Sequence, residues 1–156
     1  MDSSPDEAAA EEPGRHHMDD EDFKTLLDAT QTVAVVGLST HPEKPSVEVA
    51  KILLAAGYDV IPVHPTATEI LGRKAYATLA DIPVPVDVVD VFRPSGEAPE
   101  IARQAVEIGA GTLWLQLGLT SGEARDTAEA AGLRYVEDIC IGATTLRLGN
   151  TARDAR

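Results

Sequence analysis

Five short runs of strand-forming residues alternate with segments of helical character between residues 32 and 138. The strand-like runs are 32–37, 58–65, 86–92, 112–118 and 133–138, and the helix-like segments are 46–57, 95–109 and 121–132. Strands rich in valine that alternate with helices form parallel sheets whose two faces are covered by those helices. We therefore predict a single α/β domain built on a five-stranded parallel sheet with helices on both faces.

The remaining segments set the expected bounds of this domain. Residues 1–18 are polar and acidic and contain proline and glycine, so we predict a disordered tail in which His16 and His17 are solvated rather than metal-bound. A short helix is expected over 19–29. A small hairpin near Gly72 and a helical turn near 79–82 are expected in the connection 66–85. The domain then spans 19–149, and residues 150–156 form a short C-terminal tail.

Charge and composition exclude several classes of partner. The chain has 156 residues and a net charge of −13, and nine of its 26 acidic residues lie within residues 1–22. The mildly acidic body does not favour nucleic acid or an anionic membrane as a partner. No apolar run reaches the roughly 18 residues of a membrane span, the N-terminus has no signal-peptide pattern, and a single cysteine suits a reducing compartment. A cytoplasmic location is expected.

The segment TVAVVGLSTHPEKPS, residues 32–46, predicts an anion-binding corner. A buried-type strand leads into Gly37, a polar loop follows, and Ser46 is expected to cap the next helix. Glycine lets the backbone approach a ligand closely, and free N–H groups at a helix start attract anions. Lys44 and Arg93 add positive charge at two strand ends, so a phosphorylated ligand is expected.

Two features weigh against NAD as that ligand. The loop after Gly37 carries Ser39 and Pro42 where a G-x-G-x-x-G fingerprint has its second and third glycines. The second strand ends in His64-Pro65 rather than in the acidic residue that holds the ribose of NAD.

Five ordered motifs carry a specific resemblance. They are VVGLSTHPEKPSVEVAKILLAAGYDVIPVHP (35–65), GRKAYATLADIP (72–83), VDVVDVFRPSGEAP (86–99), LWLQLG (113–118) and VEDIC (136–140). Together they resemble the stand-alone CoA-binding domain family, which is similar to the N-terminal CoA-binding domain of the succinyl-CoA synthetase alpha subunit. The resemblance covers roughly residues 22–140 and implies a Rossmann-like sheet. His64 stands where the family usually has asparagine, and Lys44 where arginine is common.

The resemblance also implies where coenzyme A would lie. The ligand is expected over Gly37, Ser39 and the loop to Ser46, with its adenine end near His64-Pro65 and Phe92-Arg93. The candidate binding residues are Gly37, Leu38, Ser39, Lys44, Pro45, Ser46, His64, Pro65, Phe92, Arg93 and Gln116.

No catalytic or metal site is expected. The family's acyl-CoA synthetases need a phosphorylated histidine on a second domain, and none of the four histidines here follows a second-domain helix. There is no G-x-S-x-G elbow and no cluster with metal-ligand spacing. Asp90 is expected to be a structural or loop-bonded carboxylate. Cys140 is expected to be a small buried apolar residue, with a redox thiol near the CoA sulfur as the alternative.

Three functions remain open from the sequence. The first is a non-catalytic module that binds CoA or acyl-CoA. The second is a small NADP-dependent oxidoreductase with Lys44 and Arg93 on the 2′-phosphate. The third is an adaptor that senses CoA and binds a protein partner. A homodimer is left open beside such a partner.

Overall fold

The computed structural model describes residues 18–155. The predicted disordered tail and its histidine pair therefore lie outside the described residues, apart from Met18. The side chain of Met18 is partly buried and packs against the main hydrophobic cluster.

Five parallel strands form the central sheet in the order β2-β1-β5-β6-β7. Their bounds are β1 Thr32–Val36, β2 Asp59–Val63, β5 Val88–Val91, β6 Thr112–Leu115 and β7 Arg134–Val136. The chain first moves from β1 to β2 and then crosses back to place β5 on the other side of β1. Ligands of such sheets bind beyond the carboxyl ends of the strands where the order reverses, which here is between β1 and β5.

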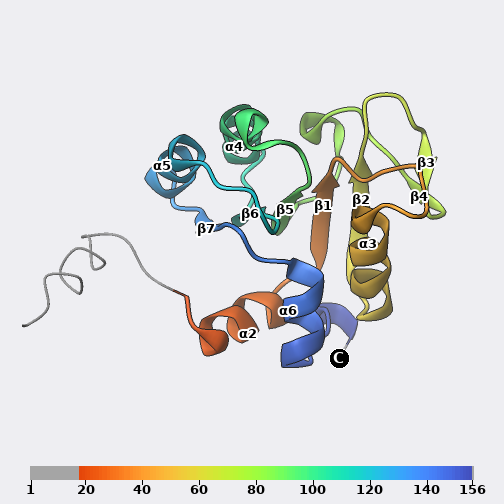
Figure 1. The fold of residues 1–156 in the computed structure, drawn as a ribbon, viewed down its shortest axis with the longest axis horizontal. Helices are drawn as coiled ribbons and strands as arrows, with labels where there is room; N and C mark the ends of the chain where they lie inside the picture. Colours follow the sequence, from red (N-terminus) through yellow and green to blue (C-terminus); the bar gives the residue numbers. More distant parts are fainter. Residues whose placement is uncertain (1–17, 156) are drawn as a thin grey trace, which may run out of the picture.

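Helices cover both faces of the sheet (Figure 1). One face carries α2 (Asp20–Asp28), α3 (Pro45–Ala55) and α6 (Ile141–Leu148), and the other carries α4 (Ala98–Glu107) and α5 (Gly122–Ala130). Each face has its own cluster of buried side chains, and the two clusters meet through alternate residues of the strands. The predicted α/β domain with a Rossmann-like five-stranded parallel sheet is confirmed.

The start of α3 differs from the prediction. Lys44 occupies the N-cap position without a side-chain capping bond, and Pro45 is the first helical residue. Proline suits this position because its fixed φ matches the helix and its missing N–H would be unpaired there anyway. The prediction that Ser46 caps the helix is wrong: its Oγ, at the second helical position, accepts the backbone N–H of Ser39 at 3.0 Å.

The connection between β2 and β5 has the two features expected of it. A two-residue turn at Leu71-Gly72 joins β3 (Glu69–Ile70) to β4 (Arg73–Lys74), with φ of 54° and 72°. A short 3-10 helix, η1, follows at Leu79–Asp81.

The segment after β7 forms a helix that the sequence did not predict. Helix α6 packs along α3, where a Cβ on Gly142 would lie 3.3 Å from a methyl group of Val49. Beyond it, residues 150–155 lie against the domain: Ala152 is fully buried, and its N–H donates to the carbonyl of Ala56 at 3.0 Å. Residues Arg153–Ala155 form the 3-10 helix η3.

Candidate functional site

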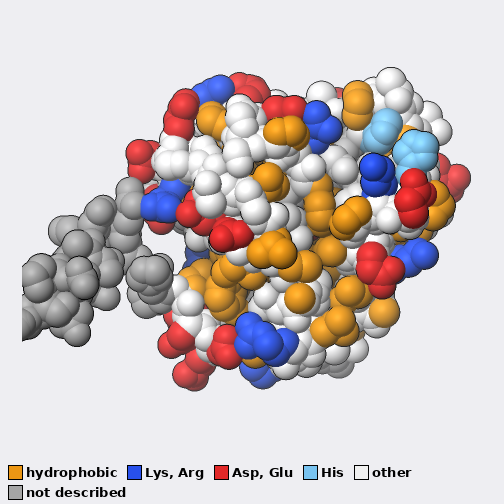
Figure 2. Space-filling view, viewed as in Figure 1, with side chains coloured by type: hydrophobic (Ala, Val, Ile, Leu, Met, Phe, Trp, Pro, Cys, Tyr) orange, Lys and Arg blue, Asp and Glu red, His pale blue; other side chains and the backbone are white. Residues whose placement is uncertain are grey.

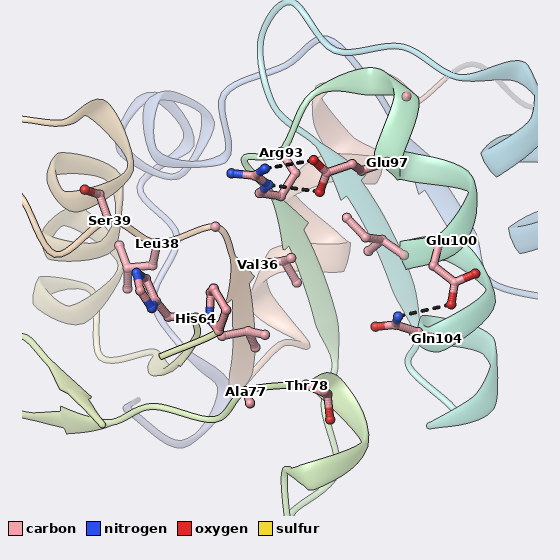
Figure 3. Close-up of a pocket in the computed structure, with 15 residues that line it drawn as sticks. Val36, Leu38, Ser39, His64, Ala77, Thr78, Arg93, Glu97, Glu100 and Gln104 are labelled. Carbon is pink, nitrogen blue, oxygen red and sulfur yellow. Dashed lines mark hydrogen bonds and ion pairs between the residues drawn. The ribbon is translucent and has the colours of Figure 1, made fainter. Parts of the chain in front are cut away.

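A pocket of about 720 Å³ opens at the carboxyl edge of the sheet beside the switch between β1 and β5. Its floor is formed by the ends of β1 and β2. Its walls are the loop after β1, the residues Ala77 and Thr78 just before η1, and the start of α4 (Figure 3). The lining residues are Val36, Gly37, Leu38, Ser39, Val63, His64, Pro65, Ala77, Thr78, Arg93, Gly96, Glu97, Glu100, Ile101 and Gln104. Six of the eleven sequence-predicted binding residues are therefore brought together here: Gly37, Leu38, Ser39, His64, Pro65 and Arg93.

Gly37 is fixed in a backbone conformation that other residues rarely adopt. Its φ is 93°, and a Cβ on it would lie 2.9 Å from Cδ of Arg93 and 3.2 Å from the backbone carbon of Phe92. Its N–H donates to the carbonyl of Val63 at 3.2 Å. The glycine thus lets the loop after β1 pass close beneath the Arg93 side chain.

The loop from Leu38 to Lys44 is held by its own hydrogen bonds. Oγ of Ser39 accepts the N–H of His41 at 2.9 Å, and the N–H of Lys44 donates to the carbonyl of His41 at 3.1 Å. The backbone N–H groups of Leu38 and Thr40 have no hydrogen-bond partner among the described residues. Thr40 is exposed, so its N–H group is available to a ligand with acceptor oxygens, whereas Leu38 is fully buried.

Three predicted binding residues at the start of α3 are not among the lining residues of the pocket. Lys44 and Pro45 are exposed, and Ser46 is buried with its hydroxyl engaged by Ser39. Lys44 makes no ion pair within the described residues. Figure 2 shows pale-blue histidine side chains beside a basic side chain on this face, near the tip of the loop.

His64 organises the turn after β2. Its Nδ1 accepts the backbone N–H groups of Thr66 at 3.1 Å and Ala67 at 2.9 Å. An asparagine side chain makes this kind of contact to the backbone two residues further on. The imidazole therefore does structurally what the usual asparagine would do, and its Nε2 edge is left for the pocket.

Arg93 is paired within the protein. Its Nε donates to Oε1 of Glu97 at 3.0 Å and its Nη2 donates to Oε2 at 2.8 Å, as the dashed lines in Figure 3 show. This contact raises the pKa of Arg93 and lowers the pKa of Glu97. The two parallel bonds fix the geometry of the pair, but both side chains are 48% exposed, so solvent keeps the interaction weak.

The other predicted residues lie on the opposite side of the sheet. Phe92 is partly buried against the cluster under α3 and α6. Gln116 is buried, and its Oε1 accepts the N–H of Ile141 at 3.1 Å, so it holds the start of α6. Cys140 is only partly buried; it occupies the N-cap of α6, where its Sγ accepts the N–H of Ala143 at 3.5 Å.

The structure contradicts one part of the prediction for Asp90, that its carboxylate bonds to a loop. It is fully buried in β5, and neither carboxylate oxygen has a hydrogen-bond partner in the described part of the chain. A loop-bonded role is therefore wrong. Burial raises the pKa of Asp90 well above its ordinary value.

Sequence reasoning missed the α4 wall of the pocket. Glu97, Glu100 and Gln104 lie there, and Nε2 of Gln104 donates to Oε2 of Glu100 at 3.2 Å. Glu100 is also paired with Arg103 at 2.8 Å. The helical i,i+4 rule does not signal the Arg93–Glu97 pair, because Arg93 precedes both η2 and α4.

Residues 18–155 contain no group of three or more histidine, cysteine, aspartate or glutamate side chains placed to hold a metal ion. Within the same residues, no helix has the length and apolar character needed to cross a membrane.

Comparison with known proteins decides the family. The family model described as CoA binding domain matches residues 31–145. The chain belongs to this CoA-binding domain family. It is 40% identical over 120 residues to the Bacillus subtilis protein named Uncharacterized protein YneT, a match that covers 77% of this chain and 89% of the relative. A segment is 32% identical over 81 residues to an ADP-forming acetate–CoA ligase II of Archaeoglobus fulgidus, covering 51% of this chain and 12% of the ligase.

Solved structures agree with this family assignment. A hypothetical protein from Pyrococcus horikoshii OT3 superposes with a TM-score of 0.83 and 38% identity, over 85% of this chain and 94% of that one. A dinucleotide-forming acetyl-coenzyme A synthetase 1 of Ca. Korarchaeum cryptofilum, solved with phosphate and ADP, gives a TM-score of 0.60 and 26% identity. That match covers 70% of this chain and 26% of the synthetase. The family is therefore represented both by small single-domain proteins and by one part of larger ligases.

Proposed function

We propose that this protein binds coenzyme A or an acyl-CoA as a small module without chemistry of its own. The observation that carries the proposal is the position of the pocket, which begins at Gly37-Leu38-Ser39 in a chain that belongs to the CoA-binding domain family. A pocket at this loop suits a nucleotide whose phosphates lie over the backbone and whose base reaches the end of β2.

The residues around the loop fit the parts of such a ligand. The unpaired N–H group of Thr40 and the exposed ammonium group of Lys44 supply donors for phosphate oxygens. His64 and Pro65, at the rim of the pocket, offer a planar surface and a polar edge for the adenine. In this proposal Ser46 acts indirectly, by holding Ser39 in place, and Gln116 by holding α6.

Calorimetric titration of the full chain with CoA, NAD and NADP tests the ligand. We expect CoA to bind and the two dinucleotides to bind more weakly or not at all, because the glycine fingerprint and the ribose-binding carboxylate are missing. Tighter binding of NADP than of CoA would replace this function with that of an NADP-dependent protein.

A separate experiment tests whether the protein catalyses acyl-CoA formation. Incubation of the protein with ATP, CoA and a panel of carboxylic acids should give no acyl-CoA above a protein-free control. Turnover that disappears in His41→Ala or His64→Ala would contradict the non-catalytic proposal.

A further inference from the structure

Arg93 and Glu97 form an ion pair at the rim of the pocket. Two parallel hydrogen bonds, of 3.0 Å and 2.8 Å, join the guanidinium to the carboxylate, and both side chains are about half exposed, at 48%. Both residues line the pocket, and in Figure 3 they point toward one another beside the loop after β1. The nearest basic group to the Gly37 corner thus already has an anionic partner.

A phosphate that binds the Nε–Nη2 edge of Arg93 needs the donors that Glu97 uses. The guanidinium presents its donors as a planar fork, and a phosphate or a carboxylate fills the fork with two oxygens. Arg93 can therefore make a bidentate contact to a ligand through Nε and Nη2 only by giving up Glu97.

The backbone of the turn that carries Glu97 is held by hydrogen bonds. Glu97 ends the 3-10 helix η2 (Ser95–Glu97), and its N–H donates to the carbonyl of Pro94 at 2.8 Å. The same turn is anchored by Ser95, whose Oγ accepts the N–H of Thr120 at 3.1 Å. Arg93 has its Cγ and Cδ against Gly37 but its head group at the surface. A change of partner therefore requires only rotation of the ends of these two side chains, both of which are 48% exposed.

The charges of the pocket mean that this exchange of partners by Arg93 affects how well the pocket binds a phosphate. The charged lining residues are Arg93, Glu97 and Glu100. With Arg93 neutralised by Glu97, the α4 wall presents no net positive charge to a phosphate. Exposed ion pairs are weak, so a ligand with several negative charges can compete for the guanidinium.

We propose that Glu97 is a displaceable counter-ion that competes with the ligand's phosphate for Arg93. It lowers the affinity for anions in general and favours ligands that offer Arg93 two acceptor oxygens. The inference rests on the proposed function, because a phosphate of CoA is the competitor. Glu97 is thereby a specificity-determining residue that need not touch the ligand.

Titration calorimetry with CoA and with inorganic pyrophosphate tests this role in the wild type, E97Q, R93A and R93A/E97Q. Because exposed ion pairs are weak, we expect E97Q to bind both probes about two- to fivefold more tightly than the wild type. The gain should vanish when E97Q is combined with R93A, since no guanidinium is then released. Glu107→Gln removes an exposed charge from α4 outside the pocket and serves as the matched control, with affinity unchanged.

The outcomes separate the two proposals. If CoA binds with the same affinity, or more weakly, to E97Q than to the wild type, Glu97 does not compete with the ligand, although the proposed function stands. If CoA fails to bind but pyrophosphate binds and is tightened by E97Q, the counter-ion role stands and CoA is the wrong ligand. If neither probe binds any of the four proteins, or if the gain persists without Arg93, the counter-ion role is wrong.

Discussion

A carboxyl group without a hydrogen-bond partner among the described residues lies within the sheet at Asp90, between Val35 of β1 and Trp114 of β6 in the strand register. Burying such a group disfavours its charged form, which raises its pKa in the folded state. The folded protein therefore holds a proton that the unfolded chain, with an aspartate pKa of about 3.9, releases. The stability associated with this proton is present at low pH and is lost as the pH rises toward the folded-state pKa.

Asp90→Asn should remove this pH dependence, because the amide stays neutral throughout. One bound proton changes the free energy of unfolding by up to about 1.4 kcal/mol per pH unit. Urea unfolding between pH 4 and pH 7 should therefore show the variant gaining stability relative to the wild type as the pH rises. Glu48→Gln, which alters an exposed carboxylate on α3, should show no such trend. Parallel curves for Asp90→Asn and the wild type would mean that the carboxyl does not titrate abnormally.

Any residue other than glycine would be strained at position 37, and the space around this position is also tightly packed. Gly118 provides a comparison, because its φ of 87° is similar but a Cβ there would meet nothing within 4 Å. Gly118→Ala should cost about 1–2 kcal/mol of stability for the left-handed backbone alone. Gly37→Ala should cost about 1–3 kcal/mol more, because the added methyl group crowds Arg93 and the backbone of Phe92. Equal losses in urea unfolding would show that the crowding is relieved without cost.

Lys44 tests the phosphate contacts of the proposed site. Lys44→Ala should weaken CoA binding by roughly five- to tenfold, because a charged hydrogen bond that is partly exposed to solvent contributes about 1 kcal/mol. The loss should shrink in high salt. Lys51→Ala removes an exposed lysine from α3 away from the loop and should leave the affinity unchanged. Equal affinities of the wild type and Lys44→Ala would make Lys44 a solvated cation with no part in binding.

At the scale of elements, the β3–β4 hairpin has an unfavourable residue in its turn. Two-residue hairpin turns with positive φ at both positions favour Asn-Gly, whereas this chain has Leu71-Gly72. Leu71 is 36% exposed, so its side chain lies at the surface but is also partly covered. The turn is therefore held by its surroundings rather than by the preference of its first residue.

Leu71→Asn should raise the free energy of unfolding by up to about 1 kcal/mol, because asparagine accepts a left-handed backbone more readily than leucine. Leu71→Val should act in the opposite direction, since a β-branched residue tolerates positive φ poorly. Both are measured by urea unfolding of the full chain. A less stable Leu71→Asn would show that the leucine side chain contributes more by packing than its turn conformation costs.

At the scale of the whole molecule, the sequence predicts the elements that follow a regular pattern along the chain. The alternation of strands and helices predicts the sheet and the helices α3, α4 and α5, and the Gly37 loop predicts one side of the pocket. Helix α6 was not predicted, because Ile141, Gly142 and the two threonines that follow are weak helix formers and its N-cap is a cysteine. Its stability comes from packing on Val49 and Ile52, a contact that no local pattern shows.

The sequence likewise predicts only part of the candidate site. Strand ends are visible in the sequence, so Gly37, His64 and Arg93 were found. Glu97 and Gln104 read as ordinary surface residues of a helix, and only the fold turns them toward the pocket. Gln116 follows a strand as expected, but the unpredicted helix engages its side chain.

The most direct test of the account is a crystal structure of the full chain grown with CoA. We predict that the diphosphate lies over the loop from Gly37 to Lys44, accepting a hydrogen bond from the N–H group of Thr40, and that the adenine lies beside His64-Pro65. Density for CoA at another surface, or an empty loop at a CoA concentration that saturates binding in solution, would contradict the central claim that this corner of the sheet is the CoA site.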